Sequence, residues 1–258
     1  MCIIAIAKDR MLTEDEIKKC FQNNSDGAGL AFPTPDGKVH IEKGFMTADD
    51  LIDYYLYSGE IPELEVASHV LHCRTATSGD TSREMTHPFK ISELSPLATR
   101  ELSDEPVLFH NGVIPDWKTL LLNMITSKQI SQMPKGPMND TRMAAIMASL
   151  PTVGLDVLDV LAGKFVVVHP SGDLTIWGHF DDANGVLFSN DGYKRVSYVY
   201  RNKNSCTYAN GYWKNGKWFS YADGKKTEVV DIDQMTDEEW KSYEHDLNKN
   251  SQLNRIYG

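Results

Sequence analysis

An apolar run opens the chain. Residues Cys2 to Ala7 carry no charge, and Lys8-Asp9-Arg10 follows at once. A short apolar run that ends at charged residues is typical of a strand buried on both faces. The run is too short for the apolar segment of a secretory signal, and no stretch of sequence reaches the length of a membrane-spanning helix. We therefore expect a strand at residues 2–7 in a cytoplasmic protein without a membrane segment.

Cys2 combines two reactive groups if Met1 is removed. Cysteine is small enough for a methionine aminopeptidase to act on Met1, and the sequence alone leaves open whether it does. The new α-amine has an ordinary pKa of roughly 7.7–8.0 and the thiol one of about 8.5, so the amine can accept the thiol proton near neutral pH. The alternative is that Cys2 is a small hydrophobe in a buried strand.

Capping signals and periodicity predict the other elements. Thr13 has capping-box spacing to Glu16, and Thr47 starts a second helix. The predicted helices are 13–23, 47–59, 117–126, 141–150, 155–161 and 236–248, and the predicted strands are 29–32, 39–41, 64–73, 107–109, 165–169, 174–177, 186–189 and 196–200, with hairpins at 208–221. Strands near both ends with helices between them predict an α+β sandwich in a single domain. We expect residues 1–200 to form it, with 201–258 as a short hairpin and helix extension packed on the same domain.

Charge and cysteine spacing exclude several classes of protein. The formal net charge of −10 argues against a nucleic-acid-coating surface, which needs clustered Lys and Arg. The four cysteines (Cys2, Cys20, Cys73 and Cys206) lie far apart and form no CxxC pair. This spacing favours reduced thiols over a zinc ribbon or a disulfide framework. His69 and His72 point to opposite faces of a strand and cannot chelate one ion. We expect no metal and no cofactor.

Four short motifs accompany Cys2. They are Asn24-Ser25-Asp26-Gly27-Ala28-Gly29-Leu30-Ala31, then His72-Cys73-Arg74-Thr75-Ala76-Thr77-Ser78-Gly79 with Thr86-His87-Pro88-Phe89 after it, then Phe109-His110-Asn111-Gly112-Val113-Ile114, and Asn139-Asp140-Thr141. In this order behind an N-terminal cysteine, they resemble the glutaminase domains of class II glutamine amidotransferases, which are N-terminal nucleophile (Ntn) hydrolases. The resemblance runs from Cys2 to about residue 190 and implies a four-layer αββα sandwich.

The resemblance also implies roles for individual residues. Cys2 would attack the side-chain amide of glutamine, and Asn111 and Gly112 would hold the oxyanion, a type of donor worth about 10²–10³ in rate. The site residues that would bind substrate are Arg74 and Thr77 at its α-carboxylate, Asp140 at its α-ammonium, and His87 as a rigid wall of the pocket.

Each of these residues also has a simpler interpretation. Asn111-Gly112 is a common hairpin turn, Asp140 is a good helix N-cap, and Arg74 is an ordinary residue at a strand end. Gly27 and Gly29 serve close packing against the first strand, because the motif lacks the spacing of a phosphate loop.

Three functions remain open at this point. The first is a glutamine amidohydrolase or amidotransferase that forms a Cys2 thioester, with a separate synthase subunit as the ammonia acceptor because 201–258 is too short for a synthase. The second is a hydrolase of γ-glutamyl amide bonds in larger molecules, and the third is a catalytically silent glutamine-binding module. Sugar-phosphate-forming members of the family often have Trp and His where this chain has Thr75 and Ser78, which disfavours that subgroup.

Overall fold

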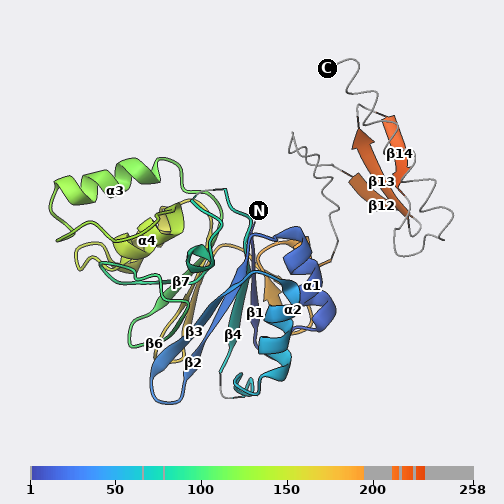
Figure 1. Cartoon of the computed structure of the whole chain (residues 1–258), viewed down its shortest axis with the longest axis horizontal. Coiled ribbons are helices and arrows are strands. Elements are labelled where there is room, and N and C mark those ends of the chain that lie inside the picture. Colours follow the sequence, from blue (N-terminus) through green and yellow to red (C-terminus); the bar gives the residue numbers. More distant parts are fainter. Residues whose placement is uncertain are drawn as a thin grey trace. The chain divides into compact units, whose positions relative to one another are not determined.

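The computed structural model describes residues 2–65, 67–77 and 79–194, and three strands within 211–229 (Figure 1). The chain divides into two compact units between residues 196 and 197. The strand predicted at 196–200 and the helix predicted at 236–248 lie outside the described residues.

The first unit is a mixed α/β fold built on two antiparallel sheets. The large sheet has the order β10 (Asp181–Asp182), β11 (Val186–Phe188), β1 (Ile3–Ala7), β4 (His69–Cys73), β2 (Ala28–Thr34), β3 (Lys38–Phe45) and β6 (Arg100–Ser103). The small sheet has the order β5 (Phe89–Lys90), β7 (Val107–Asn111), β8 (Lys164–Val168) and β9 (Leu174–Trp177). The apolar run at residues 2–7 forms β1, whose five residues are all buried.

The helices are short and lie in two groups. They are α1 (Glu14–Asn23), α2 (Ala48–Ile52) with a π-helical turn at Asp53–Tyr57, α3 (Trp117–Thr126) and α4 (Asp140–Ala148), and the 3-10 turns are Arg83–Met85, Gly154–Asp159 and Asp191–Tyr193. Thr13 and Glu16 form the predicted capping box at the start of α1. Figure 1 shows α1 and α2 on one side of the strands and α3 and α4 on the other.

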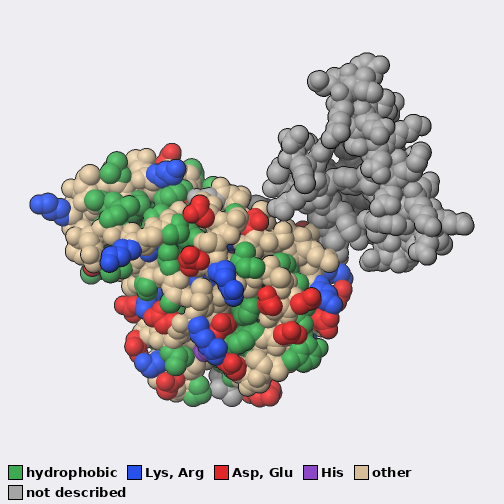
Figure 2. All heavy atoms as spheres, viewed as in Figure 1, with side chains coloured by type: hydrophobic (Ala, Val, Ile, Leu, Met, Phe, Trp, Pro, Cys, Tyr) green, Lys and Arg blue, Asp and Glu red, His purple; other side chains and the backbone are tan. Residues whose placement is uncertain are grey.

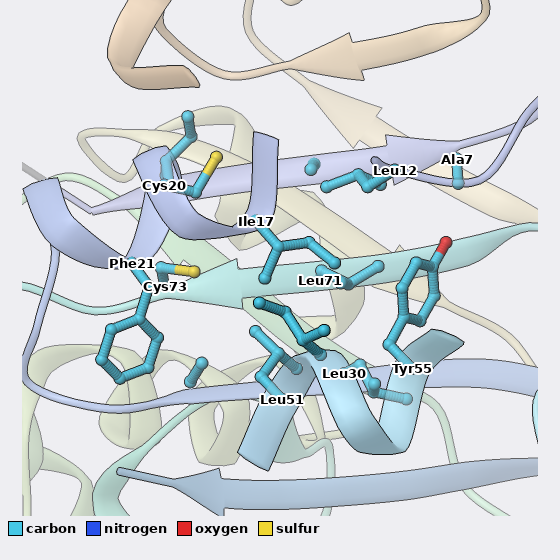
Figure 3. Packing of buried hydrophobic residues seen from close by; sticks show 14 of the residues in the cluster. Ala7, Leu12, Ile17, Cys20, Phe21, Leu30, Leu51, Tyr55, Leu71 and Cys73 are labelled. Carbon is cyan, nitrogen blue, oxygen red and sulfur yellow. The ribbon is translucent and has the colours of Figure 1, made fainter. Parts of the chain in front are cut away.

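Three apolar clusters connect these elements. One joins α1 and α2 to the large sheet, where Ile17 and Leu51 point at Leu71 (Figure 3). A second joins α3 and α4 to the small sheet, and a third contains strand residues from both sheets, among them Ile4 and Phe109. Burial of each such side chain stabilises the fold by about 1.5–3 kcal/mol.

Several predicted boundaries differ from the observed ones. The strand predicted at 64–73 begins only at His69, because the Ala67 N–H donates to the Glu63 carbonyl in a turn. The predicted helix at 155–161 is the 3-10 turn Gly154–Asp159. The prediction that Gly29 packs against the first strand is wrong, because β4 separates β2 from β1. Gly29 instead lies against the segment of His87, whose carbonyl oxygen would be 2.1 Å from a Cβ on Gly29.

Apolar side chains also reach the surface at α3. In Figure 2 they gather over the part of the molecule that Figure 1 labels α3. Leu122 on this helix is 57% exposed, and Val113 before it is 50% exposed.

The second unit contains a three-stranded antiparallel sheet of β12 (Gly211–Lys214), β13 (Lys217–Ala222) and β14 (Lys225–Val229). Lys214 pairs with Lys217, so these strands form a hairpin within the predicted range 208–221.

Candidate active site

Cys2 lines a small cavity formed where several elements begin or end. The lining residues are Cys2, Arg74, Thr75, Thr77, His87, His110, Gly112, Asn139, Asp140 and Thr141. The cavity has about 240 Å³ of empty space, including open solvent at its mouth. The antiparallel pairing of Ile3 with Cys73 places the start of β1 beside the end of β4, and so brings Cys2 next to the residues that follow Cys73.

The Cys2 thiol is buried and contacts the backbone of Thr75. Its Sγ lies 3.4 Å from both the carbonyl oxygen and the amide nitrogen of Thr75. The protonated thiol can donate a hydrogen bond to this carbonyl, and a thiolate can accept one from this N–H. Burial raises the pKa of the Cys2 thiol, while the Thr75 N–H and the Arg74 charge act in the opposite direction. A thiol in this position needs a nearby base before it becomes a nucleophile.

Two buried charges of opposite sign share the cavity. Arg74 is 2% exposed and Asp140 is 5% exposed. One Arg74 nitrogen donates to the Asp80 carbonyl at 2.6 Å. Asp140 Oδ2 accepts from the Ile114 N–H at 3.0 Å, and its other oxygen accepts from the Thr141 N–H. The N-cap of α4 is Asn139 rather than Asp140, because Asn139 Oδ1 accepts from the Arg142 N–H, so the N-cap interpretation of Asp140 was wrong.

The first quoted motif, residues 24–31, fixes the loop that carries Arg74. The Arg74 N–H donates to the Gly27 carbonyl, and the Asp26 N–H donates to the Arg74 carbonyl. The Asp26 carboxylate accepts from the Ala76 N–H at 2.8 Å. The motif therefore fixes the backbone from which Arg74 and Thr75 reach the cavity.

His87 is held from two sides. Lys43 on β3 donates to the Glu84 and Pro88 carbonyls, both at 3.0 Å, and so fixes the segment that carries His87. Burial lowers the pKa of Lys43 to about 7. The His87 ring stacks on His72 with the ring centroids 3.9 Å apart. As predicted for a strand, His72 and His69 have different surroundings, since His69 packs against Tyr55 on the side of α2.

Hydrogen bonds assign the tautomers of the cavity histidines, whose pKa values burial lowers. The Ala162 carbonyl can only accept, so His110 Nε2 carries a proton and donates to it at 3.1 Å. His110 Nδ1 is then the acceptor for the Thr141 hydroxyl at 3.0 Å. The Thr141 oxygen in turn accepts from His87 Nε2, also at 3.0 Å. A continuous series of hydrogen bonds between neutral groups thus runs from His87 through Thr141 to His110 and ends at the Ala162 carbonyl.

Asn111 lies beside the cavity at the end of β7. It is 6% exposed and is absent from the described residues that line the cavity. Its Nδ2 donates to the Ser189 hydroxyl at 2.9 Å, while its buried Oδ1 has no partner among the described residues. Gly112 does line the cavity, and a Cβ there would lie 2.7 Å from the Gly163 Cα, so this position requires glycine.

The structure therefore brings together six of the seven predicted site residues, with Asn111 adjacent to them. Sequence reasoning missed four residues that also line the cavity: Thr75, His110, Asn139 and Thr141. All four belong to the quoted motifs, so their position within these motifs was the available signal.

In the described ranges, no three His, Cys, Asp or Glu side chains gather in a way that could hold a metal ion. The helices of the same ranges are all too short or too polar to span a bilayer.

Comparisons with known proteins give a likeness in structure but none in sequence. No protein-family model matches the chain, and no curated protein matches its sequence. Among solved structures, the chain is similar to the glutamine phosphoribosylpyrophosphate (PRPP) amidotransferase from B. subtilis, complexed with ADP and GMP. The identity is 15% and the TM-score 0.45, over 89% of this chain and 49% of that chain. The chain thus spans about half the length of that protein.

Proposed function

We propose that this protein is an amidohydrolase that releases ammonia from glutamine through a thioester on Cys2. One observation carries the proposal: a cysteine thiol, a buried guanidinium and a buried carboxylate line the same small cavity. Residues 1–200 would form the catalytic domain, and 201–258 an extension of it. The three apolar clusters support a four-layer αββα order, since one cluster joins the two sheets and the others join each sheet to its helices.

The charges fit a free amino acid. An amino acid carries an α-carboxylate and an α-ammonium, and Arg74 and Asp140 offer the complementary charges. A guanidinium binds a carboxylate through two parallel hydrogen bonds. Thr77 lines the same cavity, and its hydroxyl would add a donor to that carboxylate. These contacts would fix the α end of the substrate and direct its side-chain amide to Cys2.

The chemistry follows from an N-terminal Cys2. The α-amine takes the thiol proton, and Sγ forms a bond with the amide carbon of glutamine. The oxyanion is stabilised by the Gly112 N–H and the Asn111 side-chain amide. The ammonium proton passes to the leaving nitrogen, the carbon–nitrogen bond breaks, and ammonia leaves a thioester. Water then attacks the thioester and releases glutamate and the free thiol. With Met1 attached, the Cys2 nitrogen is an amide and cannot act as the base.

Purified protein whose intact mass shows the loss of Met1 tests the proposal. We expect it to convert glutamine to glutamate, and we expect Cys2→Ala to abolish the reaction. Cys20→Ala is the matched control, because Cys20 is also buried but lies on α1 and packs in the apolar cluster between that helix and the large sheet. Equal background in the unmodified protein and in Cys2→Ala would refute the proposal, as would full activity in a protein that retains Met1.

The second candidate function, hydrolysis of γ-glutamyl amides in larger molecules, uses the same two charged residues. Arg74 and Asp140 would bind the α end of the substrate, which glutamine shares with every γ-glutamyl amide. A panel of γ-glutamyl amides beside glutamine separates the two functions by their kcat/KM values. A glutamine-like electrophile that fails to label Cys2 would instead identify a silent binding module. For a glutaminase, the implied partner is a separate synthase subunit that accepts the ammonia.

A further inference from the structure

We infer that Ser189 is a positioning residue that aligns Asn111 with Cys2 across the two sheets. The inference rests on the proposed function, because it assigns a role within the same site. Ser189 directly follows β11 and is 0% exposed.

Cys2 and Asn111 belong to different sheets. Cys2 precedes β1 of the large sheet, whereas Asn111 ends β7 of the small sheet. The distance between the nucleophile and an oxyanion donor on Asn111 therefore depends on how the two sheets are held together at this end. Since the donor must lie about 2.7–3.1 Å from the oxyanion, a small shift between the sheets is enough to weaken it.

Ser189 joins the two sheets at this point. Its Oγ accepts from the Ile4 N–H on β1 at 2.8 Å and from Asn111 Nδ2 at 2.9 Å. A serine hydroxyl has two lone pairs, and these two donors use both. The Ser189 backbone is also held from both sheets, by the Ile4 carbonyl on β1 and by Lys164 Nζ from β8.

The next residue holds the nucleophile itself. Asn190 Nδ2 donates to the Cys2 carbonyl at 2.7 Å, and its Oδ1 accepts from the Gly192 N–H. Two consecutive side chains thus bind the two residues that act in the proposed reaction. Asn190 binds Cys2, which supplies the nucleophile, and Ser189 binds Asn111, which supplies an oxyanion donor.

The hydroxyl also fits either orientation of the Asn111 amide. In the present orientation Oδ1 is buried without a partner among the described residues, at a cost of about 1–3 kcal/mol. After a half-turn of the amide, the Ser189 O–H would donate to Oδ1, and both Nδ2 protons would become available to an oxyanion. Alanine at position 189 can hold neither orientation.

The experiment is a double-mutant cycle with Ser189→Ala and Asn111→Ala. We expect Ser189→Ala to lower kcat about 10–100-fold, less than the full loss of an oxyanion donor, with little change in KM. In the Asn111→Ala background, the same change should lower kcat less than about twofold, because its effect acts through Asn111. Ser189→Thr keeps the hydroxyl and should restore most of kcat. Equal fold losses in both backgrounds would overturn the inference.

Two readouts separate this inference from the proposed function. The side-chain amide NMR signals of Asn111, assigned by their loss in Asn111→Ala, should shift in Ser189→Ala whether or not the protein hydrolyses glutamine. Unmoved signals would overturn the inference even in an active enzyme. The rate of Cys2 alkylation by iodoacetamide should stay within about twofold in Ser189→Ala, and a loss parallel to that of kcat would place the effect on the nucleophile instead. Absence of glutamine hydrolysis by the unmodified protein would refute the proposed function alone.

Discussion

Arg74 presents a buried guanidinium to the cavity, and its geometry matters as much as its charge. A planar guanidinium can form two parallel hydrogen bonds with a carboxylate, whereas a lysine ammonium cannot. A hydrogen bond to a charged group contributes about 1.5–3 kcal/mol. We therefore expect Arg74→Lys to lower kcat/KM for glutamine about 10–100-fold, mainly through KM. Steady-state kinetics over a range of glutamine concentrations measures this change.

A structural effect of Arg74→Lys needs its own control. Arg83 is exposed and lies on the 3-10 turn after the same loop, so Arg83→Lys should leave KM unchanged. A drop in kcat with unchanged KM in Arg74→Lys would contradict the role of Arg74 as a carboxylate anchor.

Residues of this site differ in how well the sequence predicts them. Arg74, His87 and Gly112 stand in the short motifs that accompany Cys2, and the structure places all four residues around one cavity. Ser189 follows an apolar strand, a position that serine occupies for many reasons. Its partners Ile4 and Asn111 are 185 and 78 positions away, so only the folded chain reveals the contact.

At the scale of the element, the first turn of α4 connects the cavity histidines. Thr141 is 1% exposed, and its hydroxyl accepts from His87 and donates to His110. Thr141→Val keeps the shape of the side chain and leaves both imidazole groups without this partner. Since each unpaired buried group costs about 1–3 kcal/mol and two are left unpaired, we expect the free energy of unfolding to fall by about 2–6 kcal/mol. Urea unfolding followed by circular dichroism measures this.

The matched control is Thr119→Val, which makes the same change at an exposed position of α3. It should alter the free energy of unfolding by no more than about 0.5 kcal/mol. Equal effects of the two substitutions would show that the Thr141 bridge contributes nothing.

Elements with a clear apolar periodicity were predictable, and edge elements were not. The observed bounds of α3, Trp117–Thr126, are the predicted ones, and its buried Leu121 and Met124 are three positions apart. By contrast, β6 was missed. It is the polar sequence Arg-Glu-Leu-Ser at a sheet edge, and among the described strands it pairs with β3 alone, so its residues show no apolar alternation. Similarly, the two-residue strand β5 is too short to leave a pattern.

At the scale of the whole molecule, the buried histidines link folding to pH. Burial lowers the pKa of His72 to about 3 and that of His69 to about 4. In the unfolded chain a histidine has a pKa of about 6.5. Between about pH 6.5 and 4 the unfolded chain therefore binds one more proton per histidine than the folded protein. Stability is retained above this range and falls as the pH is lowered through it, by about 1.4 kcal/mol per pH unit for each histidine.

This dependence can be assigned to a single ring. His69 packs against Phe32 and Tyr55, so His69→Phe keeps an aromatic ring and removes one titrating group. The free energy of unfolding, measured by urea titration at several pH values from 7.5 to 5, should fall towards low pH in the unmodified protein. In His69→Phe the slope below pH 6 should be smaller by about 1.4 kcal/mol per pH unit. His179→Asn replaces an exposed histidine and serves as the control. Identical slopes in the unmodified protein and in His69→Phe would show that His69 takes up its proton over the same pH range in the folded and the unfolded protein, and would contradict the lowered pKa of this buried ring.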